Sequence, residues 1–250
     1  MNEKKPASAN KDITGMALKS YLAGERDKTF VRRDDGFVDR EPIERYFKEY
    51  DEWSGIERDL LDGKVRGGVL ETGCSIGKHL SYLQRKGFDA AGAEISAGAV
   101  RIAKELGVKY CYCVDARDML FDRKFDTVLM LYYGFGLGGT FDGQVKFLNR
   151  LYELTSDGGQ IIASSIDACK TDNPIHIAYQ DYNKSKGKDY GDTTQVTLRL
   201  EHNGRVGAWY DLLFVNPAGL QELVGQTDWK VEAVLPEKEG GRAWYYILVK

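Results

Sequence analysis

The chain has 250 residues, of which 42% are hydrophobic and 12% aromatic, enough to bury the core of one large domain. Its net charge is −3, and the lack of a basic excess makes nucleic acid an unexpected obligate partner. No apolar stretch reaches the ~20 residues of a membrane span, and the polar first residues do not resemble a secretory signal. The four cysteines contain no C-x-x-C pair and the three histidines lie far apart, so we expect no metal site and a reducing, cytoplasmic setting.

The first part of the chain is predicted to be a tail followed by a helical cap. Residues 1–11 are polar and show no periodicity, which is typical of a disordered tail. Residues 12–66 carry apolar side chains at helical spacing, and we expect helices over 12–23, 42–53 and 56–61. Aromatic side chains of this cap either pack against the main domain or form a lid over a bound ligand.

From Gly68 onward, short apolar runs alternate with amphipathic ones. Strands are expected over 69–72, 90–95, 108–114, 125–132 and 161–165, and helices over 77–86, 97–106 and 141–154. This alternation predicts an α/β fold with a doubly wound, Rossmann-like, mostly parallel sheet that helices cover on both faces.

The pattern changes after Asp167. Residues 168–192 are polar and predict a long loop or irregular insert. Two alternating runs, 194–201 and 206–215, flank Asn203-Gly204 and predict an inserted β-hairpin. A helix over 217–224 and strands over 229–235 and 243–249 complete the chain.

The turn after the first strand of this alternation has the features of a ligand-binding cradle. Residues 69–77 read V-L-E-T-G-C-S-I-G, a strand followed by a small-residue turn and a helix start. In the dinucleotide fingerprint G-x-G-x-x-G that begins at Gly73, Ser75 and Lys78 occupy the positions of the second and third glycines. An NAD-dependent oxidoreductase is therefore disfavoured.

Acids stand at the ends of three consecutive predicted strands. Glu94 can accept hydrogen bonds from ribose hydroxyls, Asp115 from an adenine amino group, and Glu71 lies where a ligand ammonium could be held. Each acid alone could instead be a solvated strand end or a helix cap. Lys78 and His79, at the start of the next helix, either shape the ligand site or belong to an exposed helix face.

Together these segments resemble the class I S-adenosylmethionine-dependent methyltransferases. The resemblance covers about residues 45–250, and the matching segments are VLETGCSIG at 69–77, GAEIS at 92–96, VDARDM at 114–119, FDTVLML at 125–131 and GGQIIAS at 158–164. It implies a seven-stranded sheet whose last strand is antiparallel, and a cofactor-binding methyltransferase domain over 67–250. It also implies S-adenosylmethionine (SAM) as the cofactor and S-adenosylhomocysteine (SAH) as its product.

The resemblance further implies which residues bind the cofactor. The turn lies beside the methionine moiety, Glu94 at the ribose, Asp115 and Ala116 at the adenine, and Leu131 and Tyr132 at the cofactor's edge. The full set is Glu71, Gly73, Cys74, Ser75, Gly77, Glu94, Ile95, Ser96, Asp115, Ala116, Leu131 and Tyr132. Ser75 departs from the family, which most often has a glycine at this position.

Methyl transfer from a sulfonium is a direct displacement, in which positioning of the acceptor can dominate catalysis. Candidates for deprotonating the acceptor are Tyr132, Tyr133 and His176, although strand-end packing explains the tyrosines and an exposed loop the histidine. The fourth-strand region lacks the N-P-P-Y or D-P-P-Y signature of many enzymes that methylate nucleic-acid amino groups.

With the acidic net charge, this favours a small-molecule acceptor, whose pocket the insert and hairpin over 168–215 help to cover. The alternatives are an RNA or protein methyltransferase, and a SAM-binding module that transfers no methyl group.

Overall fold

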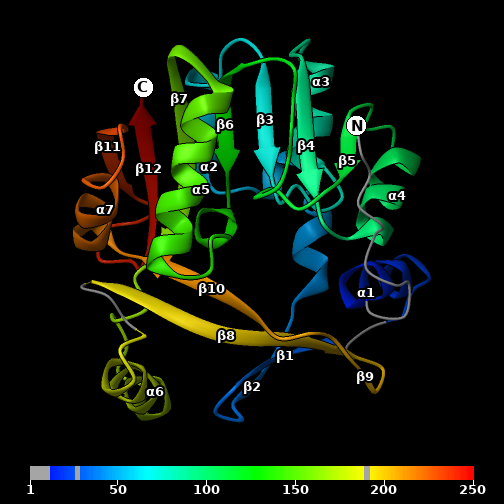
Figure 1. The fold of residues 1–250 in the computed structure, drawn as a ribbon. Coiled ribbons are helices and arrows are strands. Elements are labelled where there is room, and N and C mark those ends of the chain that lie inside the picture. The colour runs from blue at the N-terminus through cyan, green and yellow to red at the C-terminus, as the bar shows by residue number, and fades with distance from the viewer. Residues whose placement is uncertain (1–11, 26–28, 189–191) are drawn as a thin grey trace. The chain divides into compact units, whose positions relative to one another are not determined.

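The computed structural model describes residues 12–25, 29–188 and 192–250; the predicted tail over 1–11 lies outside them. A seven-stranded sheet has the order β11-β12-β7-β6-β3-β4-β5 (Figure 1). Its strands are β3 (Val69–Thr72), β4 (Ala90–Glu94), β5 (Cys111–Cys113), β6 (Phe125–Met130), β7 (Thr155–Ile166), β11 (Lys230–Pro236) and β12 (Ala243–Val249). The pairs β3–β4, β4–β5 and β6–β7 are parallel, whereas β12 is antiparallel to both β7 and β11. The predicted α/β fold with an antiparallel last strand is confirmed.

The chain divides into two compact units. Unit 1 comprises Met1–Phe121 and Leu198–Trp209, and unit 2 comprises Asp122–Thr197 and Tyr210–Lys250.

In unit 1, helices α3 (Lys78–Arg85) and α4 (Ala97–Glu105) follow β3 and β4. Every residue of β3 and β4 is buried, as expected of parallel strands that helices cover. Gly77 is the N-cap of α3 and has φ +71°, and a Cβ there would lie 3.0 Å from Val108 Cγ2. Both the backbone angle and the available space therefore require glycine at this start of α3.

The amino-terminal part of unit 1 is less helical than predicted. It contains α1 (Ile13–Leu22), β1 (Thr29–Arg33), β2 (Val38–Arg40), the 3-10 turns η2 (Ile43–Phe47) and η3 (Tyr50–Glu52), and α2 (Gly55–Gly63). The prediction of one helix over 42–53 was wrong, because only two short 3-10 turns form there. The antiparallel pair β1–β2 was not predicted at all.

The start of α1 is held against the start of α4 by a single carboxylate. Asp12 Oδ1 accepts hydrogen bonds from Gly15 N at 2.9 Å and Ser96 Oγ at 2.7 Å, and Asp12 Oδ2 accepts one from Gly98 N at 2.7 Å. A Cβ on Gly98 would lie 2.5 Å from the Cα of Gly15, so the two backbones touch. Asp12 thus caps α1 and binds α4 at the same time.

Unit 2 contains β6, the 3-10 turn η4 (Gly134–Gly136), α5 (Phe141–Leu154), β7, α6 (Pro174–Ser185), α7 (Pro217–Val224), β11 and β12. Its core includes Phe135 and Tyr246, both fully buried, and Tyr246 Oη donates to Val215 O at 2.7 Å. Helix α6 corrects the prediction of an irregular insert over 168–192. Pro174 in the first turn and the side chain of Asn173, which accepts from Ile175 N, start this polar helix.

A second sheet has the strand order β10-β8-β1-β2, with β9 paired to β8. The predicted hairpin is present as β8 (Thr193–His202), β9 (Arg205–Val206) and β10 (Tyr210–Val215). Asn203 and Gly204 both have positive φ, 48° and 76°, as a tight type I′ turn requires.

Candidate functional site

Backbone hydrogen bonds join the carboxyl ends of β3, β4 and β5 in unit 1. Gly73 N and Cys74 N both donate to Ala93 O, at 2.8 and 3.2 Å, and Val114 N donates to Glu94 O at 2.9 Å. The turn after β3 and the residues after β5 therefore both contact the end of β4. The structure brings the three strand-end acids of the sequence, Glu71, Glu94 and Asp115, to one edge of the sheet.

Glu94 is buried and fixes the turn after β3 to the turn after β4. Its Oε2 accepts from Ser75 N at 2.9 Å, and its Oε1 accepts from Ser96 N at 2.8 Å. Burial raises the pKa of the Glu94 carboxyl above its ordinary value, although these backbone hydrogen bonds oppose the shift. Each oxygen retains a lone pair, so the carboxylate can also accept ribose hydroxyls.

The turn contains one exposed glycine and an unfavourable backbone angle at Ser75. Gly73 is exposed and has φ +68°, and Ser75 has φ +50°, an unusual angle for a residue with a side chain. The Ser75 hydroxyl is buried and has no hydrogen-bond partner. Cys74 is buried, and its hydrogen bond with Cys111 at 3.5 Å, together with burial, raises the pKa of its thiol. Cys74 is therefore a packing residue of the turn and a poor nucleophile.

Behind the turn, His79 lies between two buried glutamates. His79 Nδ1 is 2.5 Å from Glu71 Oε1, and His79 Nε2 is 2.8 Å from Glu57 Oε1. All three side chains are buried. The interpretation of His79 as part of an exposed helix face was wrong, because it lies one turn before the buried Leu83 on the covered face of α3.

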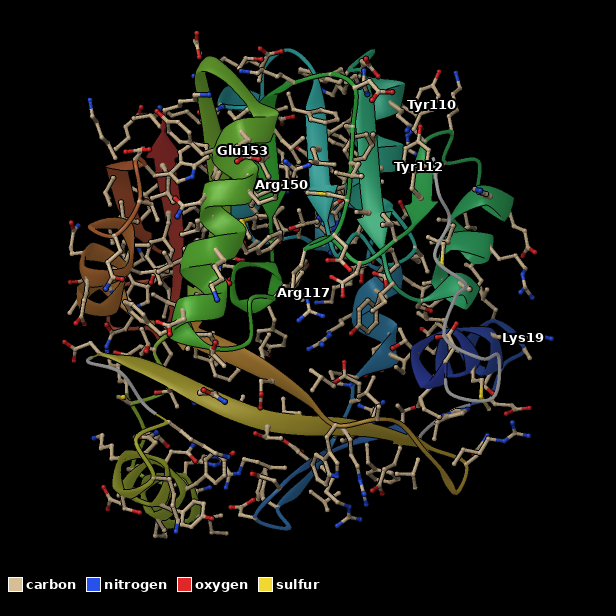
Figure 2. The ribbon with its side chains drawn as sticks, in the orientation of Figure 1. Lys19, Tyr110, Tyr112, Arg117, Arg150 and Glu153 are labelled. Atoms are coloured by element: carbon tan, nitrogen blue, oxygen red, sulfur yellow. The ribbon has the colours of Figure 1, made fainter. Side chains whose placement is uncertain are left out.

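The adenine end of the predicted site contains an ion pair. Arg117, labelled in Figure 2, donates from Nε to Asp115 Oδ1 at 2.9 Å and from Nη2 to Asp115 Oδ2 at 2.6 Å. Ala116 is buried, whereas the Ile95 side chain is 61% exposed. An exposed aliphatic side chain beside polar groups is suited to contact one face of a planar base.

These residues fit the cofactor that the sequence implies. Two oxygens in the buried part of this site, Glu71 Oε2 and Ser75 Oγ, have no hydrogen-bond partner. A buried polar atom without a partner is costly unless a ligand satisfies it. The aminoacyl end of SAM offers both donors and acceptors for such atoms.

Leu131, Tyr132 and Tyr133 belong to unit 2, after the end of β6. Leu131 is buried, whereas Tyr132 and Tyr133 are each 38% exposed. Tyr132 has φ +54°, and its carbonyl oxygen accepts from Ser164 Oγ at 3.1 Å. The ring of Tyr133 meets Phe214 of β10 edge-on, with centroids 5.7 Å apart. These contacts hold the two tyrosines in place while leaving part of each ring accessible.

His176 lies on α6 and is half-buried, so its assignment to an exposed loop was wrong. Helix α6 packs on β8, where Asn183 Nδ2 donates to Gln195 O at 2.7 Å and Tyr179 Oη accepts from Thr197 N at 3.1 Å. The three candidate bases therefore come from two different parts of unit 2, and a catalytic role for each stays a prediction.

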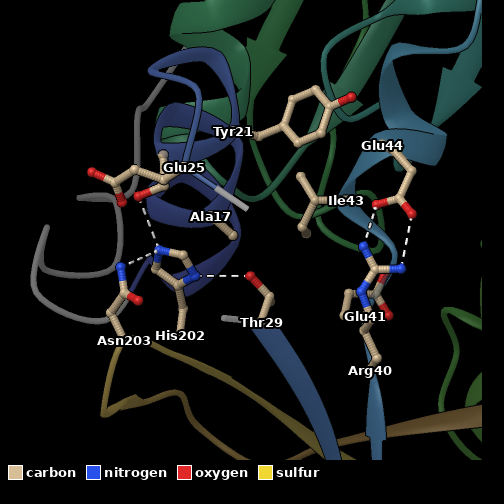
Figure 3. A pocket seen from close by; sticks show the side chains of 11 residues that line it. Ala17, Tyr21, Glu25, Thr29, Arg40, Glu41, Ile43, Glu44, His202 and Asn203 are labelled. Atoms are coloured by element: carbon tan, nitrogen blue, oxygen red, sulfur yellow. Dashed lines mark hydrogen bonds and ion pairs between the residues drawn. The ribbon is translucent and has the colours of Figure 1, made fainter. Parts of the chain in front are cut away.

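A small cavity in unit 1 lies away from the strand ends. Its volume is about 20 Å³, which is room for about one water molecule. His202 lines it and bonds through Nδ1 to Thr29 Oγ1 at 2.8 Å and through Nε2 to Ser20 Oγ at 3.0 Å (Figure 3). We interpret this cavity as a packing feature between α1 and the β8–β9 turn.

No group of three or more His, Cys, Asp or Glu side chains within the described residues is arranged to hold a metal ion. No helix in the same part of the chain is long and apolar enough to cross a bilayer.

Comparisons with known proteins relate this chain to methyltransferases. Residues 70–163 match the family model described as a methyltransferase domain. A SAM-dependent methyltransferase from Bacteroides fragilis, solved with S-adenosyl-L-homocysteine, has a TM-score of 0.81 and 23% identity, over 98% of this chain and 97% of that one. No curated protein sequence matches the chain.

Two further solved structures have the same fold. The CcbJ methyltransferase from Streptomyces caelestis has a TM-score of 0.58 and 14% identity, over 81% of this chain and 96% of that one. CalS10, an amino pentose methyltransferase from Micromonospora echinaspora, has a TM-score of 0.54 and 14% identity, over 82% of this chain and 94% of that one. Residues 70–163 are thus similar to a methyltransferase domain, and the chain shares its fold with these solved SAM-dependent methyltransferases.

Proposed function

We propose that this protein is a SAM-dependent methyltransferase that methylates a small-molecule acceptor by direct displacement. The observation that carries the proposal is the set of side chains at the carboxyl ends of β3, β4 and β5. There Glu71 and Ser75 each hold a buried oxygen without a partner, and Glu94 fixes the turn between them. This set of groups matches the ammonium, carboxylate and ribose of SAM better than a pyrophosphate.

Each residue is assigned to the part of the cofactor that its chemistry suits. Glu71 faces the ammonium, the turn from Gly73 to Gly77 offers backbone amides to the methionine moiety, and Glu94 accepts from the ribose. Asp115 and Ala116 border the adenine, Ile95 offers an aliphatic contact to it, and the resemblance implies Leu131 and Tyr132 at the cofactor's edge. When bound, SAM supplies an electrophilic methyl group on a sulfonium. The chain's own task is to align the acceptor and to exclude water.

The proposed acceptor site belongs to unit 2. The half-exposed rings of Tyr132 and Tyr133 can position an acceptor, and their hydroxyls or His176 can take its proton. We retain the proposal that the insert and hairpin over 168–215 help to cover the acceptor and that residues 12–66 act as a cap.

Two features favour a small molecule over a macromolecule. The net charge of −3 gives no general attraction for nucleic acid. CalS10, which shares the fold, is described as an amino pentose methyltransferase, and this makes a sugar-containing metabolite a reasonable first acceptor to test. We place the reaction in the cytoplasm, where its cysteine thiols stay reduced.

Titration calorimetry with SAM, SAH and NAD tests cofactor use. We expect SAM and SAH to bind and NAD not to bind, and the absence of SAM and SAH binding at high micromolar concentration would sink the proposal. Methyl-labelled SAM incubated with a metabolite extract, total RNA and total protein then tests the acceptor class. Label in the metabolite fraction supports a small molecule, label in RNA or protein moves the assignment to that class, and label in none leaves a SAM-binding module.

A further inference from the structure

The triad Glu57–His79–Glu71 joins three elements of unit 1 behind the candidate cofactor site. Glu57 comes from α2, His79 from α3 and Glu71 from β3. The relative exposure of these residues is 4%, 2% and 3%, so bulk water does not solvate these side chains. Glu71 lies two residues before the exposed Gly73 of the turn, so the triad is adjacent in sequence to the candidate cofactor site.

The protonation state of the triad follows from its hydrogen bonds. Each ring nitrogen of His79 faces a glutamate oxygen, and ionised carboxylates only accept. When both glutamates are ionised, both ring N–H groups donate to them and His79 is an imidazolium. Burial favours the neutral ring, but Glu71 and Glu57 outweigh it and raise the pKa of His79.

Further charges around the triad come from the neighbouring elements. Lys78 Nζ lies 3.7 Å from Glu57 Oε1 and 5.2 Å from the centroid of the Trp53 ring, which itself meets the His79 ring edge-on. Burial lowers the pKa of the Lys78 ammonium, and Lys48 adds to this shift. Two basic side chains, His79 and Lys78, therefore lie beside the buried carboxyl of Glu57, and His79 also contacts Glu71.

The two oxygens of Glu71 have different environments. Oε1 is bound by His79, whereas Oε2 is buried and has no partner. We propose that His79, held by Glu57, is a positioning residue that fixes Glu71 by one oxygen so that the other receives the ammonium of the cofactor's aminoacyl end. This inference rests on the proposed function, since it assumes that SAM binds at this edge of the sheet.

The alternative is that the triad only stabilises the fold. A fold-only role would affect every ligand equally, whereas a positioning role acts only on ligands that carry the ammonium. SAH and its deamino analogue, in which the adenosyl sulfur carries a butyrate without the amino group, differ in this group alone. The ratio of their affinities therefore measures the contribution of the ammonium to binding. The change in this ratio on substitution of His79 measures the contribution of His79.

The experiment compares both ligands by calorimetry on the full chain. The variants are His79→Gln and Glu57→Gln, with Tyr82→Phe as the matched control. Tyr82 lies on the same helix, and its hydroxyl bonds to Asp62 rather than to a member of the triad. We expect the wild type to prefer SAH over the analogue by at least about tenfold, the size of one charge-assisted hydrogen bond. His79→Gln should lose most of this preference, Glu57→Gln part of it, and Tyr82→Phe none.

Imidazole NMR provides a second readout, because the chain has only three histidines. We expect two N–H signals for His79 in the wild type and a lower His79 pKa in Glu57→Gln. Glu57→Gln is the milder substitution, so it remains informative if His79→Gln does not fold. Equal weakening of both ligands, or an unchanged preference, in a folded variant would overturn the positioning role while SAM binding stands. A wild type that binds neither ligand would overturn the proposed function itself.

Discussion

At the scale of single residues, Ser75 combines a strained backbone angle with a buried hydroxyl that has no partner. We expect Ser75→Gly to raise the free energy of unfolding by about 1 kcal/mol. Glycine removes both the backbone strain and the buried hydroxyl, and this gain exceeds the cost of the extra conformational entropy that glycine gives the unfolded chain. Urea unfolding followed by circular dichroism measures the change. Ser75→Ala is the control, since it removes the hydroxyl but keeps the strain and should gain less. A less stable Ser75→Gly protein would contradict this explanation.

The raised pKa of His79 predicts a pH-dependent stability. The folded-state pKa lies above the ordinary value of 6.5, so the folded state binds more protons than the unfolded chain between the two values. The stabilisation is complete below about pH 6.5 and is lost as the pH rises through the folded-state pKa. We expect the free energy of unfolding to fall over that range, and the fall to be smaller in His79→Gln. Urea titrations at a series of pH values test this; an identical slope in wild type and His79→Gln would exclude His79 as the source.

At the scale of elements, the contact between α1 and α4 depends on two glycines. A Cβ on Gly98 would lie 2.5 Å from Gly15 Cα, and one on Gly15 would lie 2.6 Å from Gly98 Cα. We expect Gly98→Ala to cost about 1–3 kcal/mol, because the helices must separate and Asp12 then loses its bonds to α4. Hydrogen exchange over Ile13–Leu22 should become faster.

Gly55→Ala is a matched control for this substitution. Gly55 lies in α2, and nothing stands within 4 Å of its added Cβ. We expect this variant to be as stable as the wild type or slightly more stable, since alanine is the better helix former. Equal effects of the two substitutions would show that the α1–α4 contact is not tightly packed.

The elements that were predicted correctly are those with strong periodicity. Strands β3, β4 and β6 are short apolar runs between amphipathic helices, and this pattern is rarely produced by anything except a covered parallel sheet. Strand β1 reads T-F-V-R-R and has only its two end residues buried, so it gives no alternating signal. It forms because β2 and β8 pair with it on both sides, an arrangement that only the tertiary structure reveals.

Part of the candidate site was predicted from the sequence for the same reason. Strand-end acids such as Glu94 and Asp115 follow recognisable strands, so their meeting at one edge could be predicted. Glu57 and His79 could not be paired, because they are 22 positions apart and on separate helices. Arg117 was missed as a partner of Asp115, although a spacing of two residues after a strand end permits such a pair.

At the scale of the whole molecule, binding of SAH should stabilise the folded chain. A ligand at 100 times its Kd adds about 2.7 kcal/mol to the free energy of unfolding, which for a chain of this size raises Tm by roughly 5–10 °C. Thermal unfolding with and without SAH measures the shift, and NAD at the same concentration should leave Tm unchanged.

Hydrogen exchange tells which of the two units holds the ligand. We expect SAH to slow exchange chiefly in unit 1, over 69–77, 92–96 and 114–116. Protection confined to unit 2, or a shift in Tm with NAD, would contradict the assignment of the cradle.

Glu94 accepts hydrogen bonds from two backbone amides, and these bonds make its role in the fold difficult to separate from its role in ligand binding by mutagenesis. Glutamine has one acceptor oxygen, so in Glu94→Gln the side-chain NH₂ would point at the backbone N–H of Ser75 or Ser96. Position 94 is therefore restricted to a carboxylate by the fold, before any ligand is considered, and a Glu94 variant that binds no SAM would report a displaced turn as much as a lost ribose contact. The neighbouring Ile95 side chain is 61% exposed, so its truncation is the cleaner probe of the ligand.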